Sequence, residues 1–345
     1  MGTEGLLKKV IFKEHVDTRK KPLNLRESDV HLFTEEWERK IRETHVLTLN
    51  DVDIVNEIIF QRPGKFFIEY THPPFDNFGV KAIGLKLLIL SKMSRILLPG
   101  KRQSLAKGVW ISDRRSYEYF HWLTEALPRL VVSREFINTH RLILPDYYGN
   151  FAYVKESLKL FDIPFEFCDA STKLKVGELI LPSQTAFSGN YNKVVINKLR
   201  DIFLSTFADV VPERKIYISR MKAKKRKVTN ESEVITLLES FKYEVHCFED
   251  YGFEKQVKLC AEAQSIIGLH GAGLTNMLFM KAGGRVLEIR NEADSHNNCY
   301  FSLASDLDLQ YYYQLSKGNK SDTHTVDVRV DVDELKKNLM LMMAS

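Results

Sequence analysis

The second half of the chain repeats one pattern, in which a short apolar strand is followed by an amphipathic helix. Strand-like runs cover residues 216–219, 243–248, 265–269, 285–289 and 311–315. The segment between the first two runs begins at Asn230, carries apolar residues at helical spacing, and has Glu233 at the position of a capping box. Alternation of strands and helices at this period predicts βαβ units, and therefore a parallel sheet covered by helices.

The first half of the chain is less regular. Residues 1–75 mix charged helix-like stretches, such as 35–43, with β-like runs, such as 66–70. The alternation of strands and helices starts again near Trp110 and continues to a strand predicted at 178–181. These signals favour a second α/β unit that begins with an irregular N-terminal part.

An amphipathic helix predicted at 190–208 joins the two halves. We therefore predict an α/β protein of two Rossmann-like domains, the first covering residues 1–190 and the second covering residues 191–345. A final helix is predicted at 332–343, and we expect it to pack back on the rest of the chain.

The composition excludes several classes of protein. With 44% hydrophobic and 28% charged residues, the 345-residue chain is neither a disordered nor a fibrous protein. Its 4 cysteines lack CxxC spacing, which argues against disulfide scaffolds and zinc ribbons and favours free thiols. No apolar stretch reaches membrane-spanning length, and no basic region precedes an apolar core at the N-terminus. Neither a transmembrane helix nor a signal peptide is therefore predicted.

A basic segment follows the first strand of the second half. Between Arg220 and Lys227 only Met221 and Ala223 are not basic, within a chain whose formal net charge is +5. Such a segment attracts phosphate, whether on a nucleotide, a nucleic acid or a lipid headgroup. It contains none of the aromatic residues that single-strand nucleic-acid binders interleave with basic ones. A solvated loop without a ligand is the alternative interpretation.

A glycine-rich turn follows the third strand of this half. It consists of His270, Gly271, Ala272, Gly273, Leu274, Thr275 and Asn276. Its glycines allow backbone amides to approach an anion at the start of a helix, although glycines needed only for packing are the alternative. Glu288 closes the next strand, where an acidic side chain can hydrogen-bond a ribose diol. Because loops at the carboxyl ends of parallel strands gather at one edge, the turn, Glu288 and the basic segment are predicted to bind one nucleotide diphosphate.

Two other patterns carry less weight. A His-Gly-Ala-Gly sequence also occurs in esterase oxyanion loops, but the chain has no Gly-x-Ser-x-Gly nucleophile elbow, which argues against a hydrolase. The pairs Asp51/Asp53 and Asp306/Asp308 have the spacing of acidic metal ligands for sugar nucleotides, but neither pair ends a predicted core strand. We therefore predict no metal site and no cofactor.

His121 and Glu125 lie four residues apart in a segment with helical spacing, so their side chains are predicted on one helix face. A carboxylate beside a histidine orients the imidazole ring and raises its basicity, which is the arrangement of a general base. A histidine with a purely structural role is the alternative.

Taken together, these motifs resemble those of glycosyltransferase family 61, which includes plant xylan arabinosyl- and xylosyltransferases and animal protein O-GlcNAc transferases of the secretory pathway. The resemblance runs from about Tyr119 to Glu288 and departs from the family pattern at Lys255, Leu269 and residues 281–284. Its landmarks are, in order, His121-Trp122, Leu127-Pro128-Arg129, Ser219-Arg220, Arg226, Asn230-Glu231, Gln256, the glycine-rich turn and Glu288.

The resemblance implies a GT-B architecture, in which two Rossmann-like domains face a cleft and the C-terminal one holds the donor. It implies an inverting, metal-independent transferase that transfers the sugar of a nucleotide-diphosphate donor to a glycan or lipid-linked glycan. The first candidate for the donor is a UDP-sugar. Arg220, Arg226 and the amides of residues 270–274 are expected to hold the diphosphate, because arginines and a helix dipole can replace a metal. Asn230 and Glu231 either belong to the donor site or only position the basic segment.

An inverting displacement also needs a base in the N-terminal half. We predict His121, oriented by Glu125, with Glu125 itself and Asp113 on the preceding loop as alternatives. Since no membrane anchor is predicted, we expect a cytoplasmic bacterial enzyme of capsule, lipopolysaccharide or exopolysaccharide synthesis, in peripheral contact with the inner face of the membrane through basic residues. The competing hypothesis is a non-catalytic Rossmann protein that binds a nucleotide or a nucleic acid through the basic segment.

Overall fold

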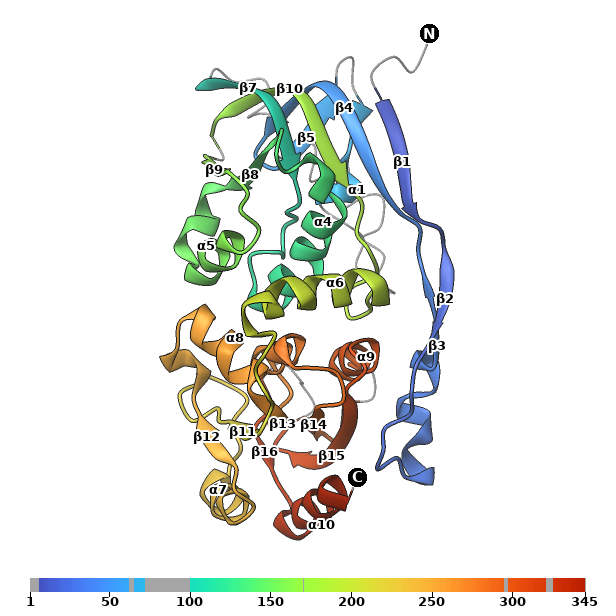
Figure 1. The fold of residues 1–345 in the computed structure, drawn as a ribbon, viewed down its shortest axis with the longest axis vertical. Coiled ribbons are helices and arrows are strands. Elements are labelled where there is room, and N and C mark those ends of the chain that lie inside the picture. Colours follow the sequence, from blue (N-terminus) through green and yellow to red (C-terminus); the bar gives the residue numbers. More distant parts are fainter. Residues whose placement is uncertain are drawn as a thin grey trace. The chain divides into compact units, whose positions relative to one another are not determined.

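The computed structural model describes residues 6–61, 65–71, 100–169, 171–294, 297–320 and 325–344. The chain divides into two compact units (Figure 1). Unit 1 contains residues 1–15 and 41–188, and unit 2 contains residues 16–40 and 189–345. The chain thus passes into unit 2 close to the predicted boundary at residue 190, but residues 16–40, which we assigned to the N-terminal domain, also pack with unit 2.

Unit 1 is built on a mixed sheet of eight strands in the order β6-β5-β4-β10-β7-β8-β9, with β1 also paired to β4. The strands are β1 Leu6–Phe12, β4 Thr44–Val55, β5 Ile58–Gln61, β6 Lys65–Phe66, β7 Arg102–Trp110, β8 Arg141–Pro145, β9 Phe165–Cys168 and β10 Lys173–Pro182. Pairings among β10, β7, β8 and β9 are parallel, whereas β1, β5 and β10 each run antiparallel to β4.

The irregular N-terminal part expected at residues 1–75 thus adds antiparallel strands to this sheet. The 12-residue strand β4 has an imperfect alternation of buried and less buried residues. This alternation is typical of an antiparallel strand with one face closer to solvent. Sequence inspection of residues 1–75 did not identify this strand. Unit 1 also contains α1 Ile68–Thr71, α3 Tyr119–His121, α4 Leu127–Val132 and α5 Ala152–Lys159.

Unit 2 contains the parallel sheet that the alternating pattern predicts. Its strands are β11 Arg214–Ile218, β12 Glu244–His246, β13 Ala263–Leu269, β14 Arg285–Asn291, β15 Gln310–Gly318 and β16 Val328–Arg329. They lie in the order β12-β11-β13-β14-β15-β16, and only the short β16 is antiparallel to its neighbour. Counted from β11, this is the doubly wound order 2-1-3-4-5.

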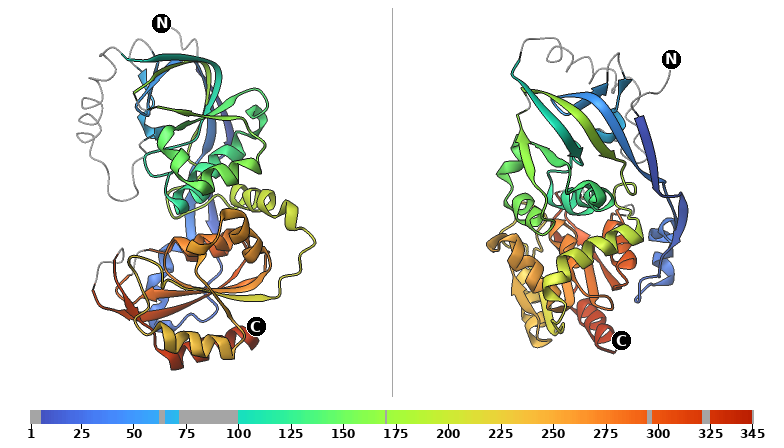
Figure 2. Two further views of the ribbon diagram at one scale, coloured as in Figure 1. Left: turned by 90° about the vertical axis from the view of Figure 1, so that its left-hand side faces the viewer. Right: turned by 45° about the horizontal axis from the view of Figure 1, so that its top comes forward.

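Helices cover both faces of this sheet (Figure 2). The helices are α6 Lys193–Leu204, α7 Glu231–Ser240, α8 Phe253–Ala261, α9 Cys299–Asp306 and α10 Val332–Ala344. Apolar residues of α7 and α10, such as Leu238 and Leu339, share one core cluster with Ile267 and Leu287 of the strands. The predicted C-terminal helix thus packs on the sheet of its own unit. None of the described helices is both long and apolar enough to cross a bilayer.

Residues 16–40 form a strap on unit 2. Strands β2 His15–Thr18 and β3 Glu38–Ile41 pair with each other, and the 3-10 helices Glu27–Leu32 and Thr34–Glu36 lie between them. The helix expected at 35–43 is therefore wrong. Phe33 is fully buried in edge and tilted contacts with Phe301, Tyr311 and Tyr313, so tertiary packing outweighs local helical propensity here.

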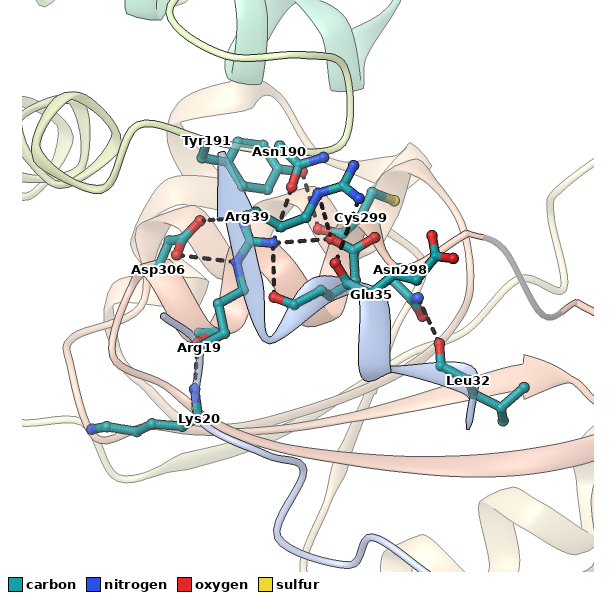
Figure 3. A network of polar contacts seen from close by, with 12 residues as sticks. Arg19, Lys20, Leu32, Glu35, Arg39, Asn190, Tyr191, Asn298, Cys299 and Asp306 are labelled. Atoms are coloured by element: carbon teal, nitrogen blue, oxygen red, sulfur yellow. Dashed lines mark hydrogen bonds and ion pairs between the residues drawn. The ribbon is translucent and has the colours of Figure 1, made fainter. Parts of the chain in front are cut away.

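Arg19 anchors the strap (Figure 3). Its fully buried guanidinium contacts the carboxylates of Glu36 at 3.0 Å and Asp306 at 3.1 Å, and it donates to Oδ1 of Asn190 at 3.0 Å. A buried arginine needs this many partners, since an unpaired buried charge is strongly destabilising. The network ties the strap to α9 and to the segment that leads into α6.

Candidate functional site

The carboxyl ends of β11 and β13 carry the two motifs that the sequence predicts to meet. In a doubly wound sheet, ligands bind outside the carboxyl ends of the strands where the strand order reverses. In unit 2 the reversal lies between β11 and β13. The basic segment Arg220–Lys227 follows β11, and the turn at His270 follows β13.

The two arginines of the basic segment border the glycine-rich turn, as predicted. A Cβ atom added to Gly271 would lie 2.7 Å from Nη1 of Arg220 and 3.7 Å from Cζ of Arg226. Nε and Nη2 of Arg220 donate to the carbonyl oxygens of Arg226 at 2.7 Å and Lys225 at 3.0 Å, so the segment folds around this side chain. A side chain at position 271 would therefore displace the guanidinium of Arg220, whereas that of Arg226 lies at ordinary contact distance.

The charges at this turn favour an anion. Burial, and then the positive charge of Arg226, lower the pKa of Arg220. Nε of Arg226 is buried and has no hydrogen-bond partner among the described residues. Two guanidinium groups held this close repel each other, and an unpaired buried donor costs free energy, so a bound phosphate would relieve both penalties.

The turn itself is a 3-10 helix, η8 Ala272–Phe279, rather than the regular helix that the pattern predicts. A Cβ atom added to Gly273 would lie 3.1 Å from Cγ2 of Ile218, so the small residue lets the turn approach β11. Nδ2 of Asn276 donates to the carbonyl of Gly273 at 3.0 Å. Leu274 and Thr275 are buried, whereas Ala272 and Gly273 are half-buried and can be reached by a ligand.

Glu231 holds the start of the basic segment, and Asn230 anchors the chain just after the segment to Val330. Oε1 of Glu231 accepts from the hydroxyls of Tyr217 at 2.9 Å and Ser219 at 2.8 Å and from the amide of Arg220 at 3.2 Å. Asn230 exchanges two hydrogen bonds with the backbone of Val330 and makes no side-chain cap, so the predicted capping box is not formed. This geometry matches the alternative in which both residues position the segment.

Glu288 lies beside the turn but faces His270. Oε1 of Glu288 is 2.5 Å from Nδ1 of His270, and Oε2 accepts from the hydroxyl of Tyr311 at 2.6 Å. The side chain of Glu288 is 0% exposed, which leaves no open path from its carboxylate to a ribose. The ribose contact that the sequence suggests thus has no support in this geometry, and Glu288 orients the imidazole of His270.

In unit 1 the predicted pair of His121 and Glu125 is formed. Nδ1 of His121 lies 2.7 Å from Oε1 of Glu125, and the hydroxyl of Ser188 donates to the same oxygen at 2.6 Å. Burial raises the pKa of Glu125, but His121, the hydrogen bond from Ser188 and the positive charge of Arg115 together lower it overall. Nη2 of Arg115 lies 2.7 Å from Nε2 of His121. Because a guanidinium only donates, Nε2 accepts and the ring proton sits on Nδ1.

A π-helical turn carries Glu125 and directly follows His121, the last residue of α3. Residues Trp122–Ala126 form one π turn between α3 and α4. Pro128 has no backbone N–H to donate to the carbonyl of Thr124, four residues earlier, so the regular pattern is interrupted here. Such π turns occur frequently at functional sites. The sequence contains the cause, Pro128, but the spacing of apolar residues alone predicts an ordinary helix.

Asp113, the alternative base, organises the turn before this helix. Its Oδ1 accepts from the amides of Arg115 at 3.0 Å and Ser116 at 3.1 Å. Burial, and then the charge of Glu125, raise the pKa of Asp113. Asp113 is buried and places Arg115 beside His121. Sequence reasoning missed Arg115, Ser188 and Tyr311, because no local pattern indicates contacts formed through the tertiary structure.

The acidic pairs considered as metal ligands have other partners. Asp306 contacts the buried Arg19, Asp308 contacts Lys193 at 2.8 Å, and Asp51 contacts Lys175 at 3.4 Å. Within the described residues, no group of three or more His, Cys, Asp or Glu side chains is arranged to hold a metal ion.

Comparisons with known proteins match part of the chain. The family described as Glycosyltransferase 61 matches residues 119–287. Three proteins named EGF domain-specific O-linked N-acetylglucosamine transferase are similar to part of the chain. The Drosophila melanogaster protein is 37% identical over 106 residues, 29% of this chain and 20% of that protein. The Xenopus laevis protein is 34% identical over 100 residues, which make up 28% of this chain and 18% of that protein. The Bos taurus protein is 33% identical over 84 residues, which make up 23% of this chain and 16% of that protein.

Proposed function

We propose that this chain, which carries a glycosyltransferase family 61 domain over residues 119–287, transfers a sugar from a nucleotide-diphosphate donor to a hydroxyl group of a glycan acceptor. The matched stretch spans a fifth or less of each curated relative, 20% for the Drosophila melanogaster protein, so the activity is argued from the sites. The observation that carries it is the convergence of Arg220 and Arg226 on Gly271 at the strand-order reversal of unit 2.

The donor diphosphate lies on this cluster in our proposal. Two guanidinium groups and the first amides of η8 supply positive charge where the leaving diphosphate develops negative charge. This is the task that a divalent metal performs in other transferases. The proposed reaction is therefore metal-independent, and a UDP-sugar is the first donor to test.

His121 is the general base in our proposal. It takes the proton of the acceptor hydroxyl while that oxygen attacks the sugar carbon and the diphosphate leaves from the opposite face, which inverts the configuration. Glu125 and Ser188 hold the imidazole with its Nε2 lone pair available, once Arg115 gives way to the acceptor. The proposal includes a GT-B arrangement, in which unit 2 contributes the donor site and unit 1 contributes the base.

The acceptor and the cellular setting are part of the same proposal. We infer a glycan or lipid-linked glycan of a bacterial cell-surface pathway, processed in the cytoplasm or at the inner face of the membrane, with basic residues making the membrane contact. The relatives are named as N-acetylglucosamine transferases that act on EGF domains. UDP-N-acetylglucosamine and a folded EGF domain therefore belong in any donor and acceptor panel.

The experiment that tests this function combines thermal-shift and hydrolysis assays with a panel of nucleotide sugars and nucleoside diphosphates. We expect one nucleoside diphosphate to raise the melting temperature and the matching sugar nucleotide to be hydrolysed slowly without an acceptor. Absence of any shift across the panel would contradict the transferase. A shift without turnover would favour a non-catalytic nucleotide-binding protein, and a shift with single-stranded RNA or DNA alone would favour a nucleic-acid binder.

A further inference from the structure

A buried arginine holds the chain that leaves the carboxyl end of β14. Nη1 of Arg290 donates to Oδ1 of Asn298 at 2.8 Å. Nη2 of Arg290 donates to the carbonyl oxygens of Asp294 and Asn297, each at 3.3 Å. Arg290 is 1% exposed, and a buried charge is costly unless it is hydrogen-bonded. Because the planar guanidinium binds several acceptors in one fixed arrangement, Arg290 fixes the described part of the chain between β14 and α9.

The strap contacts both this arginine and its side-chain partner. Nδ2 of Asn298 donates to the carbonyl oxygen of Leu32 at 2.8 Å (Figure 3). The guanidinium of Arg290 lies over the ring of Phe33, with 5.3 Å between Cζ and the ring centroid. Phe33 is fully buried, and a cation over an aromatic face is attracted more strongly where water is excluded. Two neighbouring residues of the strap thus hold the pair of Arg290 and Asn298.

The same stretch of chain reaches the glycine-rich turn. Nδ2 of Asn297 lies 3.0 Å from Nε2 of His270, and Nδ1 of His270 lies 2.5 Å from Oε1 of Glu288. Both ring nitrogens of His270 therefore have a partner. Asp294 from the same stretch lines a small cavity together with His270 and Arg226. Since His270 is the first residue of the turn, a contact that fixes its side chain also fixes where the turn begins.

We propose that Arg290 and Asn298 are positioning residues for the donor site, and that Leu32 and Phe33 of the strap support them. This inference rests on the proposed function. The pair presents Asn297 to the glycine-rich turn, whose amides we assign to the diphosphate. The four residues act on the donor through the turn and do not touch it, because a binding site keeps its geometry only when surrounding hydrogen bonds and packing lock its residues.

A purely structural role of the strap predicts a different outcome. In that case the strap stabilises unit 2 as a whole, and loosening it at any point would have the same effect on the donor site. In our proposal the effect depends on the point of attachment, because it passes through the contacts that Leu32 and Phe33 make with Asn298 and Arg290.

The test compares two asparagines that fasten the same strap. Asn298 fastens it beside the donor site, through Leu32. Asn24 fastens it to β15 and α10 instead, since its Nδ2 donates to the carbonyl oxygen of Tyr313 at 2.7 Å and to Oδ1 of Asn338 at 3.0 Å. Asn24→Ala is therefore a matched control for Asn298→Ala.

Isothermal titration calorimetry with UDP gives the affinity of each variant, and thermal melts without UDP give its stability. We expect both variants to melt at a lower temperature than the wild type. Asn298→Ala should bind UDP about fivefold or more weakly, which is the effect of one lost hydrogen bond, whereas Asn24→Ala should keep the wild-type affinity. Equal losses of affinity in the two variants, or wild-type affinity in Asn298→Ala, would overturn the proposal.

A double-mutant cycle tests whether the effect passes through Asn297. Asn297→Ala removes the contact with His270 and leaves the side chains that fasten the strap unchanged. If Asn298 acts by placing Asn297, the double variant should bind UDP no more weakly than the more weakly binding single variant. Two independent effects would multiply instead, and multiplied losses would overturn the proposal.

Phe33→Leu supplies a second variant in case Asn298→Ala does not fold. It keeps an apolar side chain at this buried position and removes the ring that faces the guanidinium of Arg290. We expect UDP to bind about twofold to fivefold more weakly, which corresponds to the loss of a cation–π contact. Wild-type affinity in a folded Phe33→Leu protein would overturn the proposal.

The outcome also separates this inference from the proposed function. A wild-type protein that binds neither UDP nor any other nucleoside diphosphate removes both. A wild-type protein that binds and turns over a UDP-sugar, with the same UDP affinity in all variants, removes the positioning role and leaves the transferase standing.

Discussion

The two units each contain a histidine whose Nδ1 faces a glutamate, and the two pairs differ in how they are built. His121 and Glu125 are four residues apart on one helical segment, whereas His270 and Glu288 come from a turn and a neighbouring strand. In both pairs a hydroxyl holds the carboxylate, from Ser188 in unit 1 and Tyr311 in unit 2. A histidine paired with a hydrogen-bonded glutamate thus arises once from residues close in sequence and once from residues that neighbouring strands bring together.

The environment of the second ring nitrogen, Nε2, differs between the two histidines. Nε2 of His121 accepts from Arg115, a neighbour that an incoming hydroxyl can replace, which suits removal of a proton. Nε2 of His270 lies 3.0 Å from Nδ2 of Asn297, and His270 shares the lining of one small cavity with Arg226, which we assign to the donor diphosphate. The comparison therefore predicts that changes in unit 1 alter turnover and that changes in unit 2 alter binding of the donor.

The largest effect is expected from His121→Ala. Loss of general-base catalysis typically lowers the rate by about 10²–10⁴-fold, so kcat should fall by that order while UDP affinity stays near the wild-type value. Steady-state kinetics and calorimetry on the same preparation measure both quantities. If His121→Ala keeps its turnover and Glu125→Ala loses it, the base is the carboxylate; if both remain active, this helix carries no base and the comparison fails.

Arg220→Ala should weaken binding of the donor nucleotide. A charge-assisted hydrogen bond is worth about 1.5–3 kcal/mol, so UDP should bind at least about tenfold more weakly. Arg141→Ala is a suitable control, because Arg141 is an exposed arginine of unit 1 whose partner is Glu166. Unchanged affinity in Arg220→Ala would remove this residue from the donor site.

A smaller effect concerns stability in acid. The folded pKa of Glu125 lies below its ordinary value of 4.5, so its ionised form stabilises the folded protein above about that pH. This contribution is lost as the pH falls through the folded pKa, and Glu125→Gln should remove it. Thermal melts between pH 7 and pH 3 should therefore fall less steeply for Glu125→Gln than for the wild type. Parallel curves would show that the pair does not lower this pKa.

No effect is expected from a chelator. Because arginines and backbone amides supply the positive charge in unit 2, transfer should continue in EDTA at the rate seen without it. An assay after exhaustive dialysis against EDTA, with and without added Mg²⁺ or Mn²⁺, measures this. Complete loss of activity that either ion restores would contradict the metal-independent mechanism and return attention to the acidic pairs at Asp51 and Asp306.

The sequence predicted which residues belong to the two sites better than it predicted the contacts of their side chains. The four-residue spacing of His121 and Glu125 predicts their contact because helix geometry is local. The meeting of Arg220 with Gly271 was also predictable, since parallel strands bring their carboxyl ends to one edge. The same rule suggested a ribose contact for Glu288. The rule predicts the edge of the sheet at which a residue lies, but it does not predict which neighbour its side chain contacts.

What the amino-acid sequence determined by itself is the alternation that gives unit 2 its parallel sheet and the motifs at its edge, because apolar periodicity and turn residues act over a few positions. Only the tertiary structure decided the rest. The strap at 16–40 joins unit 2 because Phe33 and Arg19 are buried by residues almost three hundred positions away. The partners of His121 and His270 were likewise fixed by packing, since the large majority of buried polar groups form hydrogen bonds with whichever neighbours the fold brings close.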